Sequence, residues 1–389
     1  MTKNKETPKK VVRTFAAASF LNDLGSDIIY PIWPLFVTQI LRANMTALGF
    51  LDGLGEALVS LSKFASGYFS DRIKRRKIFI WTGYLFGALS RIGYALSSVW
   101  THLIPFRILD RSGKIRSSPR DALVADISSA EERGKNFGLL RAMDHLGAFC
   151  GVLICIAFFN LLGYRLLFAL AAVPSLISAG LVFFLIKERK TEKIKLYKGI
   201  TLKDLNKNFK LFLFLSAVFT LGAFSYSFLL IYAKETGFKP AFVPVLYLIF
   251  TAVASLFSTP MGKISDRIGR KPVLLFSFLL WALVLTCFIL GESIALVAAG
   301  FVLYGAHKGA FEPVQTTFVC ELAPQSFRAS ALGGYQMVTG LCTFPASFLA
   351  GILWESWGML APFIFSLFLT IVAGILLLFV KKENSSSPT

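Results

Sequence analysis

The chain has 389 residues, of which 55% are hydrophobic, 14% aromatic and only 16% charged. Soluble domains carry about 25% charged residues, so this composition excludes an ordinary soluble enzyme and indicates a membrane protein. The formal net charge of +19 lies mainly between apolar stretches, which predicts contact with anionic membrane lipids and no nucleic-acid partner.

Twelve apolar stretches are each close to the length needed to cross a hydrocarbon core of about 30 Å. We expect helices at residues 14–38, 47–69, 78–98, 101–127, 134–160, 165–186, 209–233, 241–262, 272–291, 294–321, 328–353 and 358–380. A polar, basic segment separates the sixth from the seventh. The predicted fold is therefore an all-α polytopic membrane protein with an N-terminal six-helix bundle (1–186), a cytoplasmic linker (187–208) and a C-terminal six-helix bundle (209–389).

Lysine and arginine are unevenly divided between the two sides of these helices. One side holds both termini and the basic segments 70–77, 187–210 and 263–271. The other side carries only Arg42, Arg165, Lys234 and Lys239. By the positive-inside rule the basic side is cytoplasmic, so we expect both termini in the cytoplasm and the protein in a bacterial inner membrane.

Acidic side chains inside the spans are candidates for proton coupling. A charged group that faces lipid costs about 2.5–3.5 kcal/mol on insertion scales, so such groups must pair or line a wet cavity. Asp23 and Asp27 are four residues apart, as are Asp52 and Glu56, so each pair shares one helix face. Two close carboxyl groups in a low dielectric titrate at different pH values. The proton-coupling candidates are Asp23, Asp27, Asp52, Glu56, Asp144, His145 and Glu312.

Basic side chains inside the spans predict an anionic or zwitterionic substrate. Arg107, Arg111 and Lys114 form an i, i+4, i+7 stripe on the fourth helix, and a guanidinium group offers a planar fork that suits carboxylate or phosphate. The alternative is a purely structural network with Asp110, Asp121 and Asp144. The substrate-binding candidates are Arg107, Arg111, Lys114, Arg141, Lys308, Tyr30, Tyr226 and Tyr304.

The second half of the chain carries fewer charges in its spans and more aromatic residues. Its intramembrane polar groups are mainly His307, Lys308 and Glu312, of which the last two are four residues apart and able to pair. The five cysteines lie in apolar segments, and no zinc or haem spacing occurs. We therefore expect no metal, no cofactor and no enzymatic activity.

A repeat relates the two halves. Gly67–Lys77 (GYFSDRIKRRK) recurs as Gly262–Pro272 (GKISDRIGRKP), 195 residues later. The same offset matches Asp126 to Glu321 and Arg133 to Arg328. One offset through half of the chain indicates a duplicated half.

Twelve spans, a long central linker and these two loops resemble the major facilitator superfamily. The loop signature comprises Gly67, Ser70, Asp71, Arg72, Arg75, Arg76 and Lys77, and its repeat; a second signature comprises Arg107, Leu109, Gly113, Pro119, Asp126, Arg133 and Gly138. Within the superfamily, Ser19–Phe36 and Leu109–Gly138 resemble a little-characterised bacterial branch. The resemblance implies alternating access, in which two six-helix bundles rock about a central site.

The signature loops predict a cytoplasmic gate. Asp71 would face the positive N-terminal end of the eleventh helix, and Asp266 that of the fifth. Neighbouring arginines would pair with Asp126 and Glu321 and hold the cytoplasmic side closed. The alternative is that the loops only determine topology. The gate candidates are Asp71, Arg72, Arg76, Asp126, Arg133, Asp266, Arg267, Arg270, Glu321 and Arg328.

The sequence thus predicts a secondary active transporter, working as a monomer, that moves a small organic anion or zwitterion by proton-coupled alternating access. A carboxylate metabolite or a siderophore-like solute would fit the arginines. A multidrug or metabolite efflux antiporter is an alternative, although Gly147–Gly151 lacks the proline of the usual antiporter motif. A receptor or a lipid scramblase without coupled transport is an alternative from another class.

Overall fold

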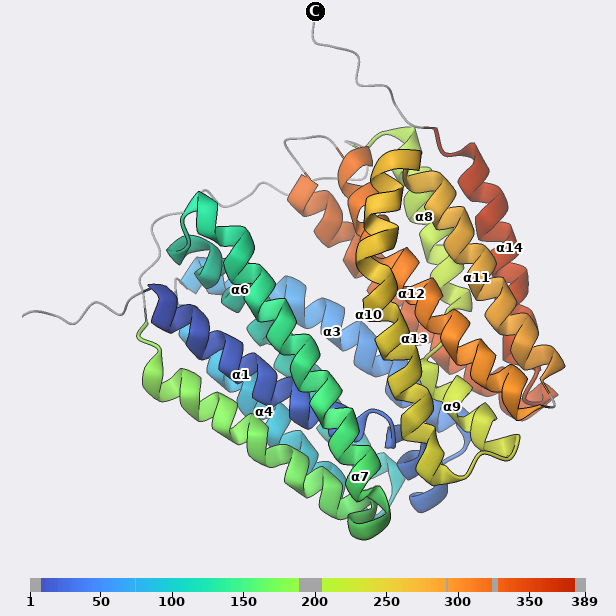
Figure 1. Ribbon diagram of the computed structural model, residues 1–389, viewed down its shortest axis with the longest axis horizontal. Coiled ribbons are helices and arrows are strands. Elements are labelled where there is room, and N and C mark those ends of the chain that lie inside the picture. Colours follow the sequence, from blue (N-terminus) through green and yellow to red (C-terminus); the bar gives the residue numbers. More distant parts are fainter. Residues whose placement is uncertain (1–7, 74, 189–204, 292, 324–327, 382–389) are drawn as a thin grey trace, which may run out of the picture. The chain divides into compact units, whose positions relative to one another are not determined.

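The computed structural model describes residues 8–73, 75–188, 205–291, 293–323 and 328–381, and every regular element in this part is helical (Figure 1). The helices form two compact units. The first holds the described residues of 1–43, 54–196 and 240–244, and the second those of 44–53, 197–239 and 245–389. Helix α3 (Met45–Ile73) therefore begins in the second unit and continues in the first. Most of the predicted linker lies outside the described residues.

The first unit is built on α1 (Pro8–Ile29), which packs along α7 (Ala130–Leu185), while α4 (Lys77–Leu96) packs on α7 as well (Figure 1). Phe15 of α1, Tyr84 of α4 and Val182 of α7 are fully buried in its core. The unit also contains α5 (Leu103–Ser112) and α6 (Ser117–Ile127). These helices carry most of the intramembrane charges.

Helix α7 contains the fifth and sixth predicted helices joined end to end. Gly163 lies between them with a φ of 66°, a left-handed conformation that favours glycine. The chain therefore turns at this residue without a loop, and α7 forms two crossings.

Three other predicted helices are interrupted. In place of 14–38, α1 ends at Ile29 and is followed by α2 (Trp33–Leu35) and a π-helical turn at Phe36–Ile40. Pro31 and Pro34 lie in this stretch, and a proline has no backbone N–H to donate to a continuous helix. In place of 209–233, α8 (Lys207–Gly222) ends before α9 (Tyr226–Glu235).

The predicted helix 101–127 is divided into η2 (Trp100–His102), α5, the 3-10 segment η3 (Gly113–Arg116) and α6. The division lies where the chain meets α4. A Cβ added at Gly83 would lie 2.5 Å from the Gly113 carbonyl oxygen, and one added at Gly113 would lie 2.7 Å from the Gly83 carbonyl oxygen. Two glycines therefore allow backbone to touch backbone at this point.

The second unit contains α8 and α9 together with α10 (Val243–Ile268), α11 (Arg270–Leu290), α12 (Ile294–Leu322), α13 (Arg328–Trp357) and α14 (Ala361–Phe379). α11 packs on α12 and α14, and α8 packs on α14 and α13 (Figure 1). Its core is aromatic, and Phe288 and Phe363 stack with ring centroids 5.5 Å apart. A short 3-10 turn, η5 (Pro240–Phe242), precedes α10.

Seven helical segments among the described residues are long and apolar enough to cross a membrane. They are Glu132–Leu185, Lys207–Glu235, Pro240–Ile268, Arg270–Leu290, Ile294–Leu322, Ala331–Trp357 and Ala361–Phe379. The first has 54 residues, enough for two crossings at about 20 residues each. α5 and α6, with 10 and 11 residues, are too short to meet this criterion, and α1 carries charged residues such as Asp23 and Asp27. The predicted fold class, an all-α polytopic membrane protein, is confirmed.

Candidate functional site

Two buried arginines of α5 form the centre of the candidate site. Arg107 and Arg111, called here the arginine pair, are 3% and 6% exposed. They are one helical turn apart and so share a face of α5. The guanidinium carbon of Arg107 lies 4.5 Å from the ring centroid of Trp33, and that of Arg111 lies 5.2 Å from the ring centroid of Tyr30. Both rings attract the cations by cation–π interaction.

Arg111 has three polar neighbours. Its Nη1 donates to the Tyr30 hydroxyl at 3.3 Å and lies 3.7 Å from Glu56 Oε1. Its Nε lies 3.5 Å from Asp110 Oδ2 but donates no hydrogen bond within the described part of the chain. The Arg111 side chain is 7% exposed, whereas that of Glu56 is 53% exposed. The buried Arg111 guanidinium thus lies beside the accessible Glu56 carboxylate, and its Nε–H remains able to donate a further hydrogen bond.

A glycine of α3 makes room for the arginine pair. A Cβ added at Gly55 would lie 2.9 Å from Arg107 Nε and 3.2 Å from Arg111 Nε. Gly55 stands next to the candidate Glu56 but was not predicted as a site residue. Gly53 and Gly55 form a Gly-x-Gly pattern in the sequence, and this pattern could have indicated that another part of the chain packs closely on the helix here.

The predicted third member of the arginine stripe lies in another element. Lys114 belongs to η3, after α5 has ended at Ser112. The 3-10 geometry has 3.0 residues per turn instead of 3.6, but it covers only two of the seven steps from Arg107 to Lys114. The predicted face of the stripe is therefore changed little by the break.

A second charged cluster joins α6 to α7. Arg120 Nε donates to Asp121 Oδ1 at 3.0 Å, and its Nη1 donates to Ser19 Oγ at 2.5 Å. The same Nη1 lies 3.6 Å from Asp144 Oδ1, and Arg141 lies 3.4 Å from Asp144 and 3.6 Å from Asp121. Two arginines and two aspartates thus neutralise one another. Arg141 is 61% exposed, and the candidate His145 also lies on the exposed surface.

Arg91 of α4 is a buried arginine with neutral partners. Its Nη1 donates to the Ala171 carbonyl at 2.8 Å and to Ser175 Oγ, and its Nη2 donates to Ser26 Oγ at 2.8 Å. Ser175 in turn donates to Asn22 Oδ1 at 3.0 Å. Arg91 therefore cross-links α1, α4 and α7. Asn22 also donates to the candidate Asp23 at 2.9 Å, and Asp27 is 8% exposed.

The two acids of α3 have different partners in different units. Asp52, 3% exposed, accepts a hydrogen bond from Ser225 Oγ at 2.7 Å in the second unit, whereas Glu56 meets Arg111 in the first. Beside Asp52, α3 packs closely on α13. A Cβ at Gly49 would lie 2.1 Å from the Ser347 carbonyl oxygen.

The candidates of the second half lie in or beside its aromatic core. Tyr226 packs on Tyr247 with ring centroids 5.3 Å apart, and Tyr304 packs on Phe250 at 5.0 Å. His307, 3% exposed, has its Nδ1 2.8 Å from the Ser277 carbonyl. Lys308 and Glu312 form an i, i+4 ion pair at 3.4 Å, as the structural alternative expects.

The gate candidates form ion pairs inside each unit. Arg76 pairs with Asp126 in the first unit, and Arg270 lies 2.9 Å from Glu321 in the second. Arg270 also lies 2.5 Å from Asp266. Neither pair joins one unit to the other, so they brace their own halves.

The remaining gate candidates make few contacts. Arg72 and Arg267 are exposed, and Arg133 donates to the Ala125 carbonyl at 3.3 Å. The side chains of Asp71 and Arg328 lie outside the described part. At the repeat offset of 195, Arg270 corresponds to Arg75, one residue before the arginine that pairs in the first half.

Comparisons with known proteins agree on one family. The family model described as Major Facilitator Superfamily matches residues 15–232 and 211–389. The "Uncharacterized MFS-type transporter MJ1317" of Methanocaldococcus jannaschii is 34% identical over 398 residues, with 98% of each chain covered.

Solved transporters share the fold at low identity. A bacterial homologue of the human lysosomal transporter Spinster, inward-facing and occupied, has a TM-score of 0.79 at 13% identity, covering 97% of both chains. The D323A mutant of the nucleoside transporter NupG has a TM-score of 0.81 at 15% identity, covering 95% of this chain and 99% of that one.

Proposed function

The chain belongs to the Major Facilitator Superfamily, and from this premise we propose that it is a proton-coupled secondary transporter of a small organic anion or zwitterion. The substrate carboxylate or phosphate binds the arginine pair, Arg107 and Arg111. The observation that supports this proposal is the contact between buried Arg111 and accessible Glu56, at 3.7 Å.

Glu56 couples the proton to the substrate by competing for Arg111. When Glu56 is ionised, its carboxylate satisfies the arginine and opposes a second anion. When Glu56 binds a proton, that charge is removed and the guanidinium fork is open to the substrate. Proton and anion therefore bind together, and each raises the affinity for the other by the same factor.

The rings of Tyr30 and Trp33 favour a flat substrate. They hold the guanidinium groups by their faces, which keeps the arginine forks in fixed planes. A planar carboxylate matches such a fork by two parallel hydrogen bonds. A carboxylate metabolite or a carboxylate-type siderophore fits this arrangement better than an apolar cation does.

The proposed transport cycle is alternating access in a cell inner membrane, with both termini in the cytoplasm. The excess of lysine and arginine on one side supports this orientation. The two six-helix bundles, 1–186 and 209–389, rock about the site, with residues 187–208 as the link. The intra-unit pairs Arg76–Asp126 and Arg270–Glu321 keep each half rigid while it moves.

A thermal-shift screen against carboxylate metabolites and siderophores tests the binding step, because a ligand of the native state raises its apparent stability. We expect a binder whose thermal shift is lost in Arg111→Lys, since lysine lacks the fork. The matched control is Arg42→Lys, which alters an exposed arginine far along the chain from α5. A ligand set made only of apolar cations, with shifts equal in both variants, would favour the drug-antiporter alternative.

A further inference from the structure

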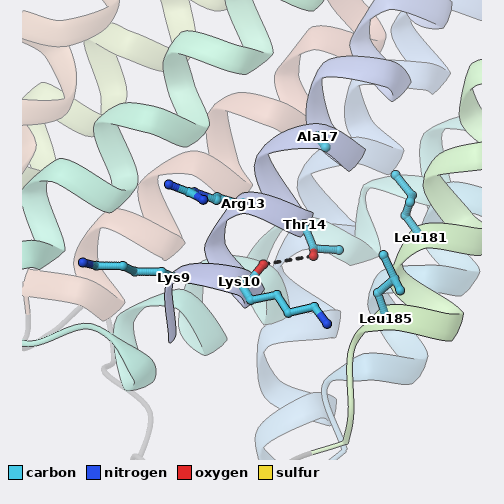
Figure 2. Close-up of a pocket in the computed structure, with 7 residues that line it drawn as sticks. All are labelled: Lys9, Lys10, Arg13, Thr14, Ala17, Leu181 and Leu185. Carbon is cyan, nitrogen blue, oxygen red and sulfur yellow. Dashed lines mark hydrogen bonds between the residues drawn. The ribbon is translucent and has the colours of Figure 1, made fainter. Parts of the chain in front are cut away.

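A basic pocket opens between the start of α1 and the end of α7, within the first unit (Figure 2). It has a volume of about 490 Å³. The residues that line this pocket are Lys9, Lys10, Arg13, Thr14, Ala17, Leu181 and Leu185. None of these residues belongs to the arginine pair or to the ion pairs Arg76–Asp126 and Arg270–Glu321.

The lining of the basic pocket changes in polarity along α1. Lys9 and Lys10 lie at the first turn of α1, Arg13 one turn deeper and Ala17 a further turn deeper. Leu185 ends α7 at the level of Lys10, and Leu181 lies one turn deeper. Since the helix rises about 1.5 Å per residue, the α1 side of the pocket changes from cationic at Lys9 to apolar at Ala17 within about 12 Å. This is the polarity profile of a phospholipid, whose charged headgroup stands above its acyl chains.

Within the described part of the chain, the cations of the basic pocket have no counter-charge. All three cationic side chains are exposed, and no ion pair with any of them occurs among the described residues. In Figure 2, Lys10 extends to the side of Leu181 and Leu185, whereas Lys9 and Arg13 extend to the other side of α1. The first turn of α1 contains no acidic residue, although a helix N-terminus favours anions over cations. A bound anion would relieve both the mutual repulsion of these cations and their conflict with the helix dipole.

The apolar part of the lining favours lipid over a free inorganic anion. Leu185 is 40% exposed, and the adjacent Phe184 is 80% exposed. Both belong to the segment Glu132–Leu185, which is apolar enough to cross a membrane. A free phosphate ion would gain nothing from the leucines, whereas an acyl chain would bury them.

We propose that the basic pocket binds an anionic phospholipid of the cytoplasmic leaflet, with its phosphate at Lys10 and an acyl chain on Ala17, Leu181 and Leu185, while Lys9 and Arg13 add positive charge from the other side of α1. The inference uses the proposed orientation of the chain but not the proposed substrate. Basic pockets between transmembrane helices on this side select anionic headgroups, because the leaflet itself is rich in them. The lipid would hold the start of α1 against the end of α7.

The test is a titration of the purified full-length protein with dioleoyl phosphatidylglycerol, followed by native mass spectrometry. Each basic residue near an anionic lipid contributes about 5-fold in affinity, so Lys10→Gln/Arg13→Gln should weaken binding about 30-fold. The matched control is Lys207→Gln/Lys210→Gln, which removes two exposed charges from the start of α8 and should change binding less than about 5-fold. Lys10→Arg/Arg13→Lys keeps both charges and should retain the native affinity, which excludes a folding defect.

Two further arms identify the bound chemistry. Dioleoyl phosphatidylcholine should bind far more weakly than the anionic lipid, and inorganic phosphate should not displace the lipid at equal concentration. Equal losses in the two Gln double variants would show general attraction by net charge and overturn the proposal. Displacement by phosphate at equal concentration would instead assign the pocket to a free anion.

Discussion

Replacing Gly55 with alanine should impair the site while leaving the fold nearly as stable. The added Cβ would lie 2.9 Å from Arg107 Nε and 3.2 Å from Arg111 Nε. These atoms are parts of long side chains, so the guanidinium groups move by a few tenths of an ångström and the helix backbone stays in place. The change therefore acts directly on the arginine pair.

The expected magnitudes separate stability from function. Overpacking costs about 1–3 kcal/mol, and replacing glycine by alanine inside a helix returns about 1 kcal/mol. The free energy of unfolding should thus fall by only about 0–2 kcal/mol. A 1 Å displacement of a positioning group costs about 100-fold, so a few tenths of an ångström should raise the KM for transport about 3- to 10-fold.

The assay is uptake kinetics in proteoliposomes, combined with thermal unfolding of the same preparation. Gly180→Ala is the matched control, because a Cβ there meets nothing within 4 Å. It should keep the native KM and gain up to about 1 kcal/mol of stability. A native KM in Gly55→Ala, or an equal rise of KM in both variants, would refute the placement of the substrate at the arginine pair.

Two further predictions concern the packing of each unit. Gly49→Ala should lower the free energy of unfolding by about 1–3 kcal/mol. The added Cβ would lie 2.1 Å from the Ser347 carbonyl oxygen, which is a backbone atom and cannot move away as a flexible side chain can. A melting curve like that of Gly180→Ala would contradict this prediction. Arg91→Lys should reduce stability by about 1.5–3 kcal/mol for each charged hydrogen bond lost, measured by thermal unfolding, with the KM of the folded fraction unchanged. A fully stable Arg91→Lys protein would show that the cross-link between α1, α4 and α7 is dispensable.

The sequence predicts which segments are helical but not where the helices break. Hydrophobic length identifies the regions, because the bilayer fixes how many apolar residues are needed. The interruption at Gly113 depends on Gly83, thirty residues away in α4, and no local pattern contains that contact. The sequence likewise shows Gly163 only as part of the gap between the predicted helices 134–160 and 165–186. In the structure its left-handed φ of 66° lets one helix follow the other directly.

Spacing predicts helix faces in the site but not the partners on them. The i, i+4 relation of Arg107 and Arg111 correctly places them on one face, and that of Lys308 and Glu312 correctly allows an ion pair. Asp52 and Glu56 have the same spacing, yet they meet a serine of the second unit and an arginine of the first. Ring partners such as Trp33 and the space left at Gly55 depend on tertiary contacts, which spacing within one helix does not contain.

The most direct test of proton coupling compares Glu56→Gln with Glu312→Gln. Both carboxylates are more than half exposed and pair with one basic side chain, so the two variants remove the same charge from similar surroundings. The measurement is uptake of the best ligand from the thermal-shift screen into proteoliposomes, with and without an imposed pH gradient. We predict that the gradient accelerates uptake by the native protein and by Glu312→Gln but no longer affects Glu56→Gln. A gradient response that survives in Glu56→Gln would contradict competition between Glu56 and the substrate for Arg111.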